Sequence, residues 1–400
     1  MSKQTIKTAT QFKRITIETV KQFELSFRKI DELWAEDLET AEKNCEKRNE
    51  TQYNNSMEEY RKNKEDKDGA YIPKPPKRKC PDQKEIDEFA IKHGKLSEYL
   101  KRSIIPSRDG GYWVIENGSV VLKSKEAFNK IEKKLNAKSK GIMKSVIDDC
   151  VELYTPDVYT DDYLIDHENF RINLSKRFNF TYKKNFYAGN KESQREAIKN
   201  SKTIIAFMKE VITSNIEEEW SCLSYIISCM SKRKQSQIVT FLTGLGGIGK
   251  TFFTDILRML FGSSFASTSE ATLTGENQFN MMIVGAVSAC LEETSGRENY
   301  QKMMSKIKEF ATSKQLTARK MYVEGFQVAN MLNIFVLSNH FRDIDCAERR
   351  VFCPTLNNKY QNDHKYFEEL SECLTEDALQ LVYNFFLKVI LKNLLKSPIT

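Results

Sequence analysis

The chain has 400 residues, of which 40% are hydrophobic and 29% charged, and its formal net charge is +7. This length allows two or three domains with at least one sizeable core, and the composition indicates a soluble, mostly globular protein. A positive surplus this small permits nucleic-acid binding without establishing it.

Two further features exclude whole classes of protein. No apolar run approaches the roughly 20 residues of a membrane-spanning helix, and the polar N-terminus lacks the apolar core of a signal peptide. The nine cysteines include no CxxC pair, which favours reduced thiols over a zinc site. We therefore expect a soluble, intracellular protein without a membrane partner.

The N-terminal part is expected to be mostly helical with one β-hairpin. Residues 1–72 carry apolar side chains at helical spacing in a charged background, and residues 73–160 are expected to form a proline-rich linker and a small α+β module. In that module, Lys84–Lys101 is typical of one helix. Gly111–Leu122 is typical of a hairpin turning at Asn117-Gly118. A nucleic-acid-binding module and a plain adaptor both fit this pattern.

The C-terminal part changes in character along the chain. Residues 161–235 predict a helical collar or connector, with Glu217–Lys232 as its last helix. In residues 236–356 strand-like apolar runs alternate with helices, which predicts an α/β unit around a mainly parallel sheet. Residues 357–400 predict C-terminal helices.

A glycine-rich motif follows the first of these strands. Gln237–Thr243 has strand character, Gly244–Thr251 matches GxxxxGK[ST], and Phe252–Phe261 has helical spacing and ends at Gly262. Glycines let backbone N–H groups approach phosphate oxygens, and the helix N-terminus favours the same anion. The motif predicts a P-loop for ATP and Mg²⁺, in which Lys250 reaches the β- and γ-phosphates and the Thr251 hydroxyl binds the metal. The expected nucleotide contacts are Gly244, Leu245, Gly246, Gly247, Ile248, Gly249, Lys250 and Thr251.

Two later strands end in polar residues. The apolar run Met282–Leu291 leads into Glu292-Glu293, and we expect a neighbouring strand to bring these acids beside the loop. Glu292 would hold the metal and Glu293 would orient or deprotonate the attacking water, unless the pair begins a surface loop. Asn339 follows the strand Leu332–Ser338, where an amide could hydrogen-bond the γ-phosphate or that water.

An arginine pair, Arg349 and Arg350, precedes the apolar Val351-Phe352. Arginine keeps its charge and presents a planar fork to phosphate oxygens, so one of the pair could reach a neighbouring subunit's ATP in a ring. Taken alone, the pair is more typical of an exposed surface.

Taken in order, these motifs resemble a superfamily 3 helicase of the viral and phage AAA+ type. They are most similar to the poxvirus-type and phage primase–helicase group. Leu273–Phe279 and Phe170–Leu174 add to the likeness, which covers about residues 165–355. It implies a P-loop AAA+-type ATPase that forms a homo-oligomeric ring, expected to be a hexamer. By this likeness Asn339 is the sensor and Arg350 the preferred arginine finger, with Arg349 second.

The resemblance also implies a basic hairpin that contacts nucleic acid in the central channel. It would include Arg319, Lys320 and Tyr322, with a turn at Glu324-Gly325, and Lys306 and Lys308 just before it. Lysine and arginine would neutralise phosphates and Tyr322 would stack on a base. A solvated basic hairpin is the alternative.

The leading hypothesis is an ATP-dependent helicase that moves on single-stranded DNA to replicate a virus or mobile genetic element, with other replication proteins such as a primase as partners. An RNA-virus-type RNA helicase is one alternative. A non-translocating P-loop ATPase for packaging, partition or assembly is another, which would not need the basic hairpin. No HxH metal pair or nucleophilic tyrosine context supports a primase or nicking domain within the chain.

Overall fold

The computed structural model describes most of the chain. The described residues are 14–16, 18–65, 74–107, 111–117, 119–127, 129–130, 133, 154–158, 163–183, 189–268, 280–292, 300–320, 322–339 and 349–389. The chain divides into two compact units, residues 1–155 with 162–172 and residues 156–161 with 173–400. Among the helices within the described ranges, none is both long and apolar enough to cross a membrane.

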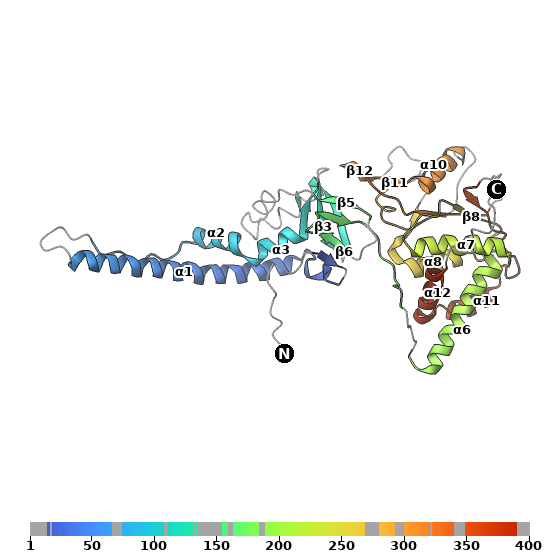
Figure 1. Ribbon diagram of the computed structural model, residues 1–400, viewed down its shortest axis with the longest axis horizontal. Helices are drawn as coiled ribbons and strands as arrows, with labels where there is room; N and C mark the ends of the chain where they lie inside the picture. Colours follow the sequence, from blue (N-terminus) through green and yellow to red (C-terminus); the bar gives the residue numbers. More distant parts are fainter. Residues whose placement is uncertain are drawn as a thin grey trace. The chain divides into compact units, whose positions relative to one another are not determined.

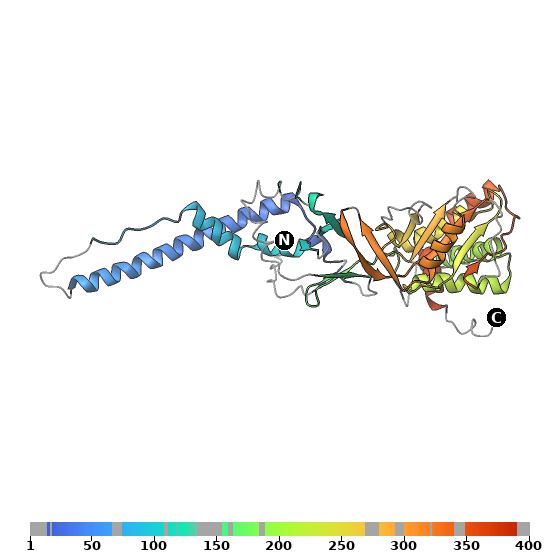
Figure 2. The same cartoon turned by 90° about the horizontal axis from the view of Figure 1, so that it is seen from above.

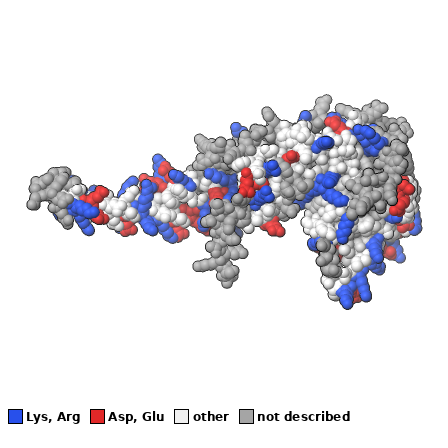
Figure 3. Space-filling view, viewed as in Figure 1, with Lys and Arg blue, Asp and Glu red and all other residues white. Residues whose placement is uncertain are grey.

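The first unit is built on a long polar helix. A short 3₁₀ turn, η2 (Val20–Gln22), precedes α1 (Phe27–Glu65), which is 39 residues long. Basic and acidic side chains are interspersed along α1 (Figure 3). Helices α2 (Gln83–His93) and α3 (Lys95–Ser103) pack along it, and Leu25, Ile30, Leu96 and Leu100 belong to the core where α1 meets α3.

The prediction of one helix over Lys84–Lys101 is wrong, because the helix breaks at Gly94. This residue has an extended conformation (φ −79°, ψ 156°). The next two amides, of Lys95 and Leu96, donate to the buried carboxylate of Asp37 at 2.9 and 2.8 Å. A Cβ on residue 94 would overlap that carboxylate. Asp37 of α1 therefore caps α3, and only glycine leaves room for it.

Two small sheets complete the N-terminal part. The first is antiparallel and has the order β2 (Ile104–Pro106), β3 (Gly111–Glu116) and β4 (Ser119–Ser124). It confirms the predicted hairpin, with Asn117 at φ 49° in the turn. The second has the order β1-β6-β7-β5, formed by β1 (Arg14–Thr16), β6 (Tyr163–Asp166), β7 (Arg171–Asn173) and β5 (Thr155–Asp157). In the second sheet, β1 and β7 each pair antiparallel with β6.

The second unit contains a five-stranded parallel sheet, which confirms the predicted mixed α/β architecture. Its order is β14-β8-β13-β10-β9, and every pairing is parallel. The strands are β14 (Val351–Phe352), β8 (Val239–Thr243), β13 (Asn333–Ser338), β10 (Ser288–Glu292) and β9 (Phe265–Thr268).

Helices cover both faces of this sheet (Figure 1). Alternate strand residues divide between two cores: Leu242 and Phe335 face one core, and Phe241 and Val336 face the other. The first core packs against α6 (Lys191–Phe207) with its π-helical extension η3 (Met208–Ile212), α7 (Glu217–Ser231), α8 (Lys250–Phe261), α11 (His364–Glu372) and α12 (Glu376–Lys388). The second packs against α10 (Tyr300–Thr312) and the hairpin of β11 (Gln315–Lys320) and β12 (Val323–Ala329). A short 3₁₀ turn, η4 (Gly262–Ser264), follows α8.

Strand β10 differs from its prediction in two ways. It begins only at Ser288, because the chain turns between Met281 and Gly285, where Gly285 has φ 72° and lies against the backbone of Leu174. It is also not the direct neighbour of β8, since β13 lies between them. Glu292 therefore ends a strand two positions away from the one that leads into the glycine-rich loop.

Candidate functional site

The glycine-rich loop joins the end of β8 to the start of α8. Gly247 (φ 76°) and Gly249 (φ 99°) adopt left-handed conformations, and Gly249 is the N-cap of α8. A Cβ on Gly247 would overlap the side-chain oxygen of Asn362, whereas a Cβ on Gly246 would meet nothing within 4 Å. The loop thus needs glycine at these two left-handed positions, and it brings backbone N–H groups to the positive end of a 12-residue helix.

Lys250, the first residue of α8, lies inside the loop. Its side chain is buried, and its Nζ donates to the carbonyl oxygens of Gly244 and Leu245, both at 2.8 Å. Burial lowers the pKa of the Lys250 ammonium. An anion bound beside this ammonium would favour its charged form, so the loop is suited to hold a phosphate.

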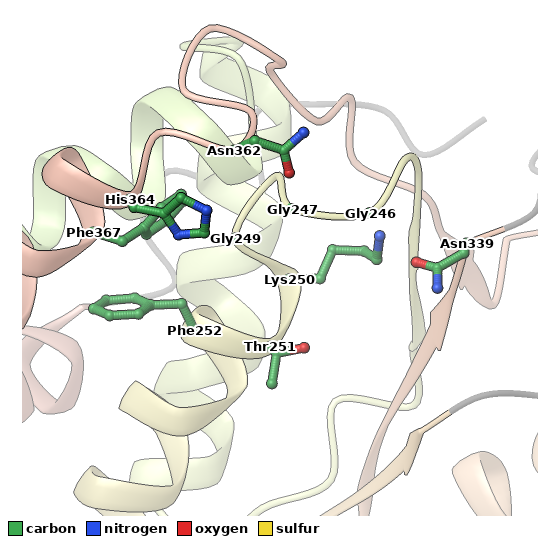
Figure 4. A pocket seen from close by; sticks show the side chains of 10 residues that line it. All are labelled: Gly246, Gly247, Gly249, Lys250, Thr251, Phe252, Asn339, Asn362, His364 and Phe367. Carbon is green, nitrogen blue, oxygen red and sulfur yellow. The ribbon is translucent and has the colours of Figure 1, made fainter.

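Residues from three elements line one cavity at the carboxyl edge of the sheet. It has a volume of about 400 Å³ and is lined by Lys250, Thr251, Glu292, Leu337, Ser338 and Asn339. Figure 4 shows Asn339 facing Lys250 and Thr251 from the end of its strand. The structure therefore brings together four residues that the sequence analysis selected on separate segments, at the edge where open α/β sheets bind ligands.

The oxygen donors of this cavity fit Mg²⁺. The Thr251 hydroxyl and the Glu292 carboxylate are both solvent-accessible. Within the part of the chain that the structure describes, no group of three or more His, Cys, Asp or Glu side chains could hold a metal. Mg²⁺ suits such a sparse set, because it is commonly bound through one or two protein oxygens together with water and substrate phosphates.

An aromatic cavity adjoins the first at Lys250, Thr251 and Asn339. It has a volume of about 340 Å³, and Phe252, Asn362, His364 and Phe367 lie on its far side from Asn339 (Figure 4). These four residues were not among the site residues predicted from sequence. Phe252 follows the motif directly, but no local signal marks the other three, which come from the turn before α11 and its first turn.

Arg258 of α8 is a further site residue that was not predicted from sequence. Its Nη2 lies 3.1 Å from Oε1 of Glu292 and 3.1 Å from the hydroxyl of Ser267, and it pairs with Asp255 one turn earlier. A signal was available, because Arg258 lies seven residues after Thr251 and so on the same face of the helix. The Arg258 guanidinium fixes the Glu292 carboxylate at the end of β10.

Arg349 and Arg350 lie at the opposite edge of the sheet. They directly precede β14, and the carbonyl oxygen of Arg350 accepts from the N–H of Val239, the first residue of β8. The glycine-rich loop follows Thr243, the last residue of β8. It therefore lies about 15 Å from Val239 and Arg350, at the other end of this five-residue strand. Neither arginine is therefore placed to reach the loop of its own chain.

The basic hairpin exists, but it turns earlier than predicted. Lys320 pairs with Val323, so the turn contains Tyr322, which has φ 62° and is 73% exposed. The predicted turn at Glu324-Gly325 is wrong, because Leu316, Ala318 and Val328 must share one buried face, and that requirement sets the register.

The predicted nucleic-acid residues fall into two groups. Arg319, Lys320 and Tyr322 lie at the tip of the hairpin, which projects beyond the parallel sheet (Figure 2). Lys306 and Lys308 lie on α10 instead, where Lys306 pairs with Glu309 at 2.8 Å. Two other predicted features, Glu293 and Leu273–Phe279, lie outside the described residues.

One family model matches part of the second unit. Residues 242–350, which run from β8 to the arginine pair, match a family model described as a family of unknown function (DUF5906). No curated protein matches the chain.

Solved structures of one protein region resemble the chain in fold. An A-form apo structure of the NrS-1 C-terminal region is 15% identical over 72% of this chain and 66% of that chain, with a TM-score of 0.52. A second apo structure of this region is 14% identical with the same coverage and TM-score, and a third is 15% identical over 65% of its length. The chain thus spans just under two thirds of each solved chain, and identities this low show a shared fold alone.

Proposed function

We propose that the chain is an ATP-driven helicase of the superfamily 3 type, which assembles into a ring and moves along single-stranded DNA. The observation that carries the proposal is the cavity shared by Lys250, Thr251, Glu292 and Asn339 at the head of α8. A lysine inside a glycine loop, a hydroxyl, a carboxylate and an amide are the groups that phosphoryl transfer from a nucleoside triphosphate requires.

The chain's own residues have separate roles in this proposal. The loop amides and Lys250 bind the β- and γ-phosphates, and Asn339 hydrogen-bonds the γ-phosphate or the attacking water. Bound Mg²⁺ would neutralise charge on the β- and γ-phosphates, with Thr251 and Glu292 as its protein partners. Glu293 accepts a proton as the water oxygen bonds to the γ-phosphorus and the bond to ADP breaks.

The position of the arginine pair supports a ring. Because Arg349 and Arg350 lie at the edge of the sheet away from the glycine loop, they could stabilise the transition state only on a neighbouring copy. In the ring that we propose, that edge of one subunit would face the nucleotide of the next. We assign the arginine finger to Arg350 and the second place to Arg349.

The hairpin supplies the contact with nucleic acid. Arg319 and Lys320 would neutralise backbone phosphates, and the exposed ring of Tyr322 offers a face on which a base can stack. Lys306 and Lys308 on α10 precede the hairpin in the chain and would add to the same positive surface.

The test is ATP hydrolysis measured with single-stranded DNA, with single-stranded RNA and with neither. We expect single-stranded DNA to stimulate hydrolysis, and Lys320→Ala to remove most of the stimulation. Lys314→Ala is the matched control, because this lysine is exposed near the base of the same hairpin. Equal thermal unfolding temperatures for the two variants would show that Lys320→Ala leaves the fold intact.

The same measurement separates the alternatives. Stimulation by RNA alone would replace the proposal with an RNA helicase. Hydrolysis that no polynucleotide changes would favour a packaging, partition or assembly ATPase, for which the hairpin has no role.

A further inference from the structure

The two adjoining cavities differ in chemistry. One contains the carboxylate of Glu292 and the polar ends of β13, and the other is walled by Phe252, Phe367 and His364. Lys250 and Thr251 lie between them and line both (Figure 4). A nucleotide has the same division, with a charged triphosphate at one end and an aromatic base at the other.

The aromatic wall is a packed structure. The rings of Phe252 and Phe367 have centroids 5.5 Å apart, and Phe207 packs against both at 5.5 and 6.3 Å. Phe367 also lies against Gly249, where a Cβ would be 3.0 Å from its ring. His364, in the first turn of α11, is exposed and lines the same cavity. The wall is therefore fixed in position beside the loop.

The segment that carries His364 and Phe367 is hydrogen-bonded to the outside of the glycine loop. The backbone N–H of Asn362 donates to the carbonyl oxygen of Gly247 at 3.0 Å. Nε2 of Gln361 donates to the carbonyl oxygen of Gly246 at 3.1 Å. These hydrogen bonds connect the aromatic wall directly to the glycine loop.

Further contacts hold this segment against the rest of the unit. Tyr360 and Tyr366 stack in parallel with centroids 3.7 Å apart, and burial raises the pKa of the Tyr366 hydroxyl to about 12. Lys359 pairs with Glu210 at 2.7 Å, and the side chain of Asp363 caps α11 by accepting from the Tyr366 amide. The segment is ordered before any ligand arrives, so a ligand meets a preformed surface.

We propose that Phe252, His364 and Phe367 form a subsite for the base of a purine nucleotide. The inference rests on the proposed function, which names ATP, and adds the residues that hold the base and favour purines over pyrimidines. A two-ring base covers more of this three-ring wall than a pyrimidine does, so it gains more from stacking. The imidazole of His364 can also exchange a hydrogen bond with the base edge or the ribose.

The test is calorimetric titration of the full chain with ATP, GTP, CTP, UTP and inorganic tripolyphosphate, each with Mg²⁺. We expect the two purine nucleotides to bind about tenfold or more tightly than the pyrimidine nucleotides and tripolyphosphate. His364→Ala should reduce the preference for ATP over tripolyphosphate by about fivefold. The control is Lys365→Ala, since this neighbouring side chain on α11 is 85% exposed and does not line the cavity.

Phe367→Leu provides a second variant, because leucine keeps an apolar side chain in the core while removing the ring. We expect it to reduce the same preference, provided its thermal unfolding temperature stays near that of the unaltered chain. If its unfolding temperature falls, the result for His364→Ala decides.

The outcomes separate this inference from the proposed function. If tripolyphosphate binds as tightly as ATP, or His364→Ala keeps the full preference, the base subsite is wrong while the phosphate site stands. If neither ATP nor tripolyphosphate binds, both proposals fail. A preference for pyrimidine nucleotides would likewise overturn the purine subsite.

Discussion

Arg258 of α8 and Glu292 of β10 form an ion pair, with Nη2 of the arginine 3.1 Å from Oε1 of the glutamate. The same guanidinium contacts Asp255 and Ser267, so it joins a helix to two strands of the sheet. Glu292 reaches the cavity at the head of α8 while its carboxylate is held from behind. Arg258 is thus a positioning residue for the carboxylate that the proposal assigns to the metal.

Replacing Arg258 should therefore weaken the response to Mg²⁺. Loss of a residue that orients a metal-binding carboxylate lowers metal affinity or activity by roughly 10- to 100-fold. We expect Arg258→Ala to raise the Mg²⁺ concentration needed for half-maximal ATP hydrolysis, and Arg258→Lys to recover only part of it, because lysine lacks the planar fork. Arg195→Ala, an exposed arginine on α6, is the control. An unchanged Mg²⁺ dependence in Arg258→Ala would contradict this role.

Two adjacent glycines in the loop should respond differently to alanine. Gly247→Ala places a side chain at φ 76° and against Asn362, whereas Gly246→Ala meets open space. The left-handed conformation alone costs about 1–2 kcal/mol for an L-residue. We expect Gly247→Ala to lower ATP affinity by about tenfold or more and Gly246→Ala to change it little. Equal effects of the two substitutions on the ATP dissociation constant would show that the loop binds nucleotide in another conformation.

The arginine pair leads to a test by subunit mixing. Removing an arginine finger lowers turnover by roughly 10³-fold or more, so Arg350→Ala and Lys250→Ala should each be nearly inactive alone. A mixture of the two should regain part of the ATPase rate, because an intact Lys250 and an intact Arg350 then meet at some subunit boundaries. Mixtures that stay inactive, although the subunits exchange, would count against a finger acting between copies.

In the first unit, stability should depend on pH through His167. Burial, with a smaller contribution from Arg102, lowers the pKa of the His167 imidazole to about 4, and Tyr154 lies within hydrogen-bond distance of Nδ1 at 2.6 Å. Between pH 6.5 and about 4 the unfolded chain binds a proton that the folded chain does not. Stability is therefore complete above pH 6.5 and falls as pH decreases towards 4, by as much as about 3 kcal/mol.

The measurement is urea unfolding at pH 7 and pH 5, followed by tryptophan fluorescence. In a Trp220→Phe background the remaining tryptophans, Trp34 and Trp113, both report on the first unit. His167→Asn, which can still accept from Tyr154 but does not titrate, should reduce the difference between the two pH values. The exposed His93→Asn should not. A difference that persists in His167→Asn would assign the pH dependence to other groups.

Much of the second unit could be predicted from sequence because its signals are local. The glycine spacing, the apolar run of β8 and the helical spacing after Lys250 lie within about twenty-five residues, and each predicts its own element. The strand ends at Glu292 and Asn339 follow from similar short patterns. Since parallel strands bring their carboxyl ends to one edge, these separate segments could be expected to share a site.

What sequence alone missed depends on contacts between distant segments. The break at Gly94 is set by a carboxylate on α1, and the position of β10 is set by which strand pairs with β8. Two rings of the aromatic wall, His364 and Phe367, come from α11, more than a hundred residues after the loop. Asn362 gives no sign in sequence that it packs on Gly247. Such pairings depend on tertiary packing, which local propensity and spacing do not encode.

Phosphate release from ATP in the presence of Mg²⁺ decides whether the site at the head of α8 hydrolyses ATP. The unaltered chain is compared with Glu292→Gln and with Glu218→Gln, an exposed glutamate on α7. We expect hydrolysis by the unaltered chain and by Glu218→Gln, and a loss of turnover in Glu292→Gln of roughly 100-fold or more with ATP still bound. No hydrolysis by the unaltered chain, or full turnover by Glu292→Gln, would contradict this expectation.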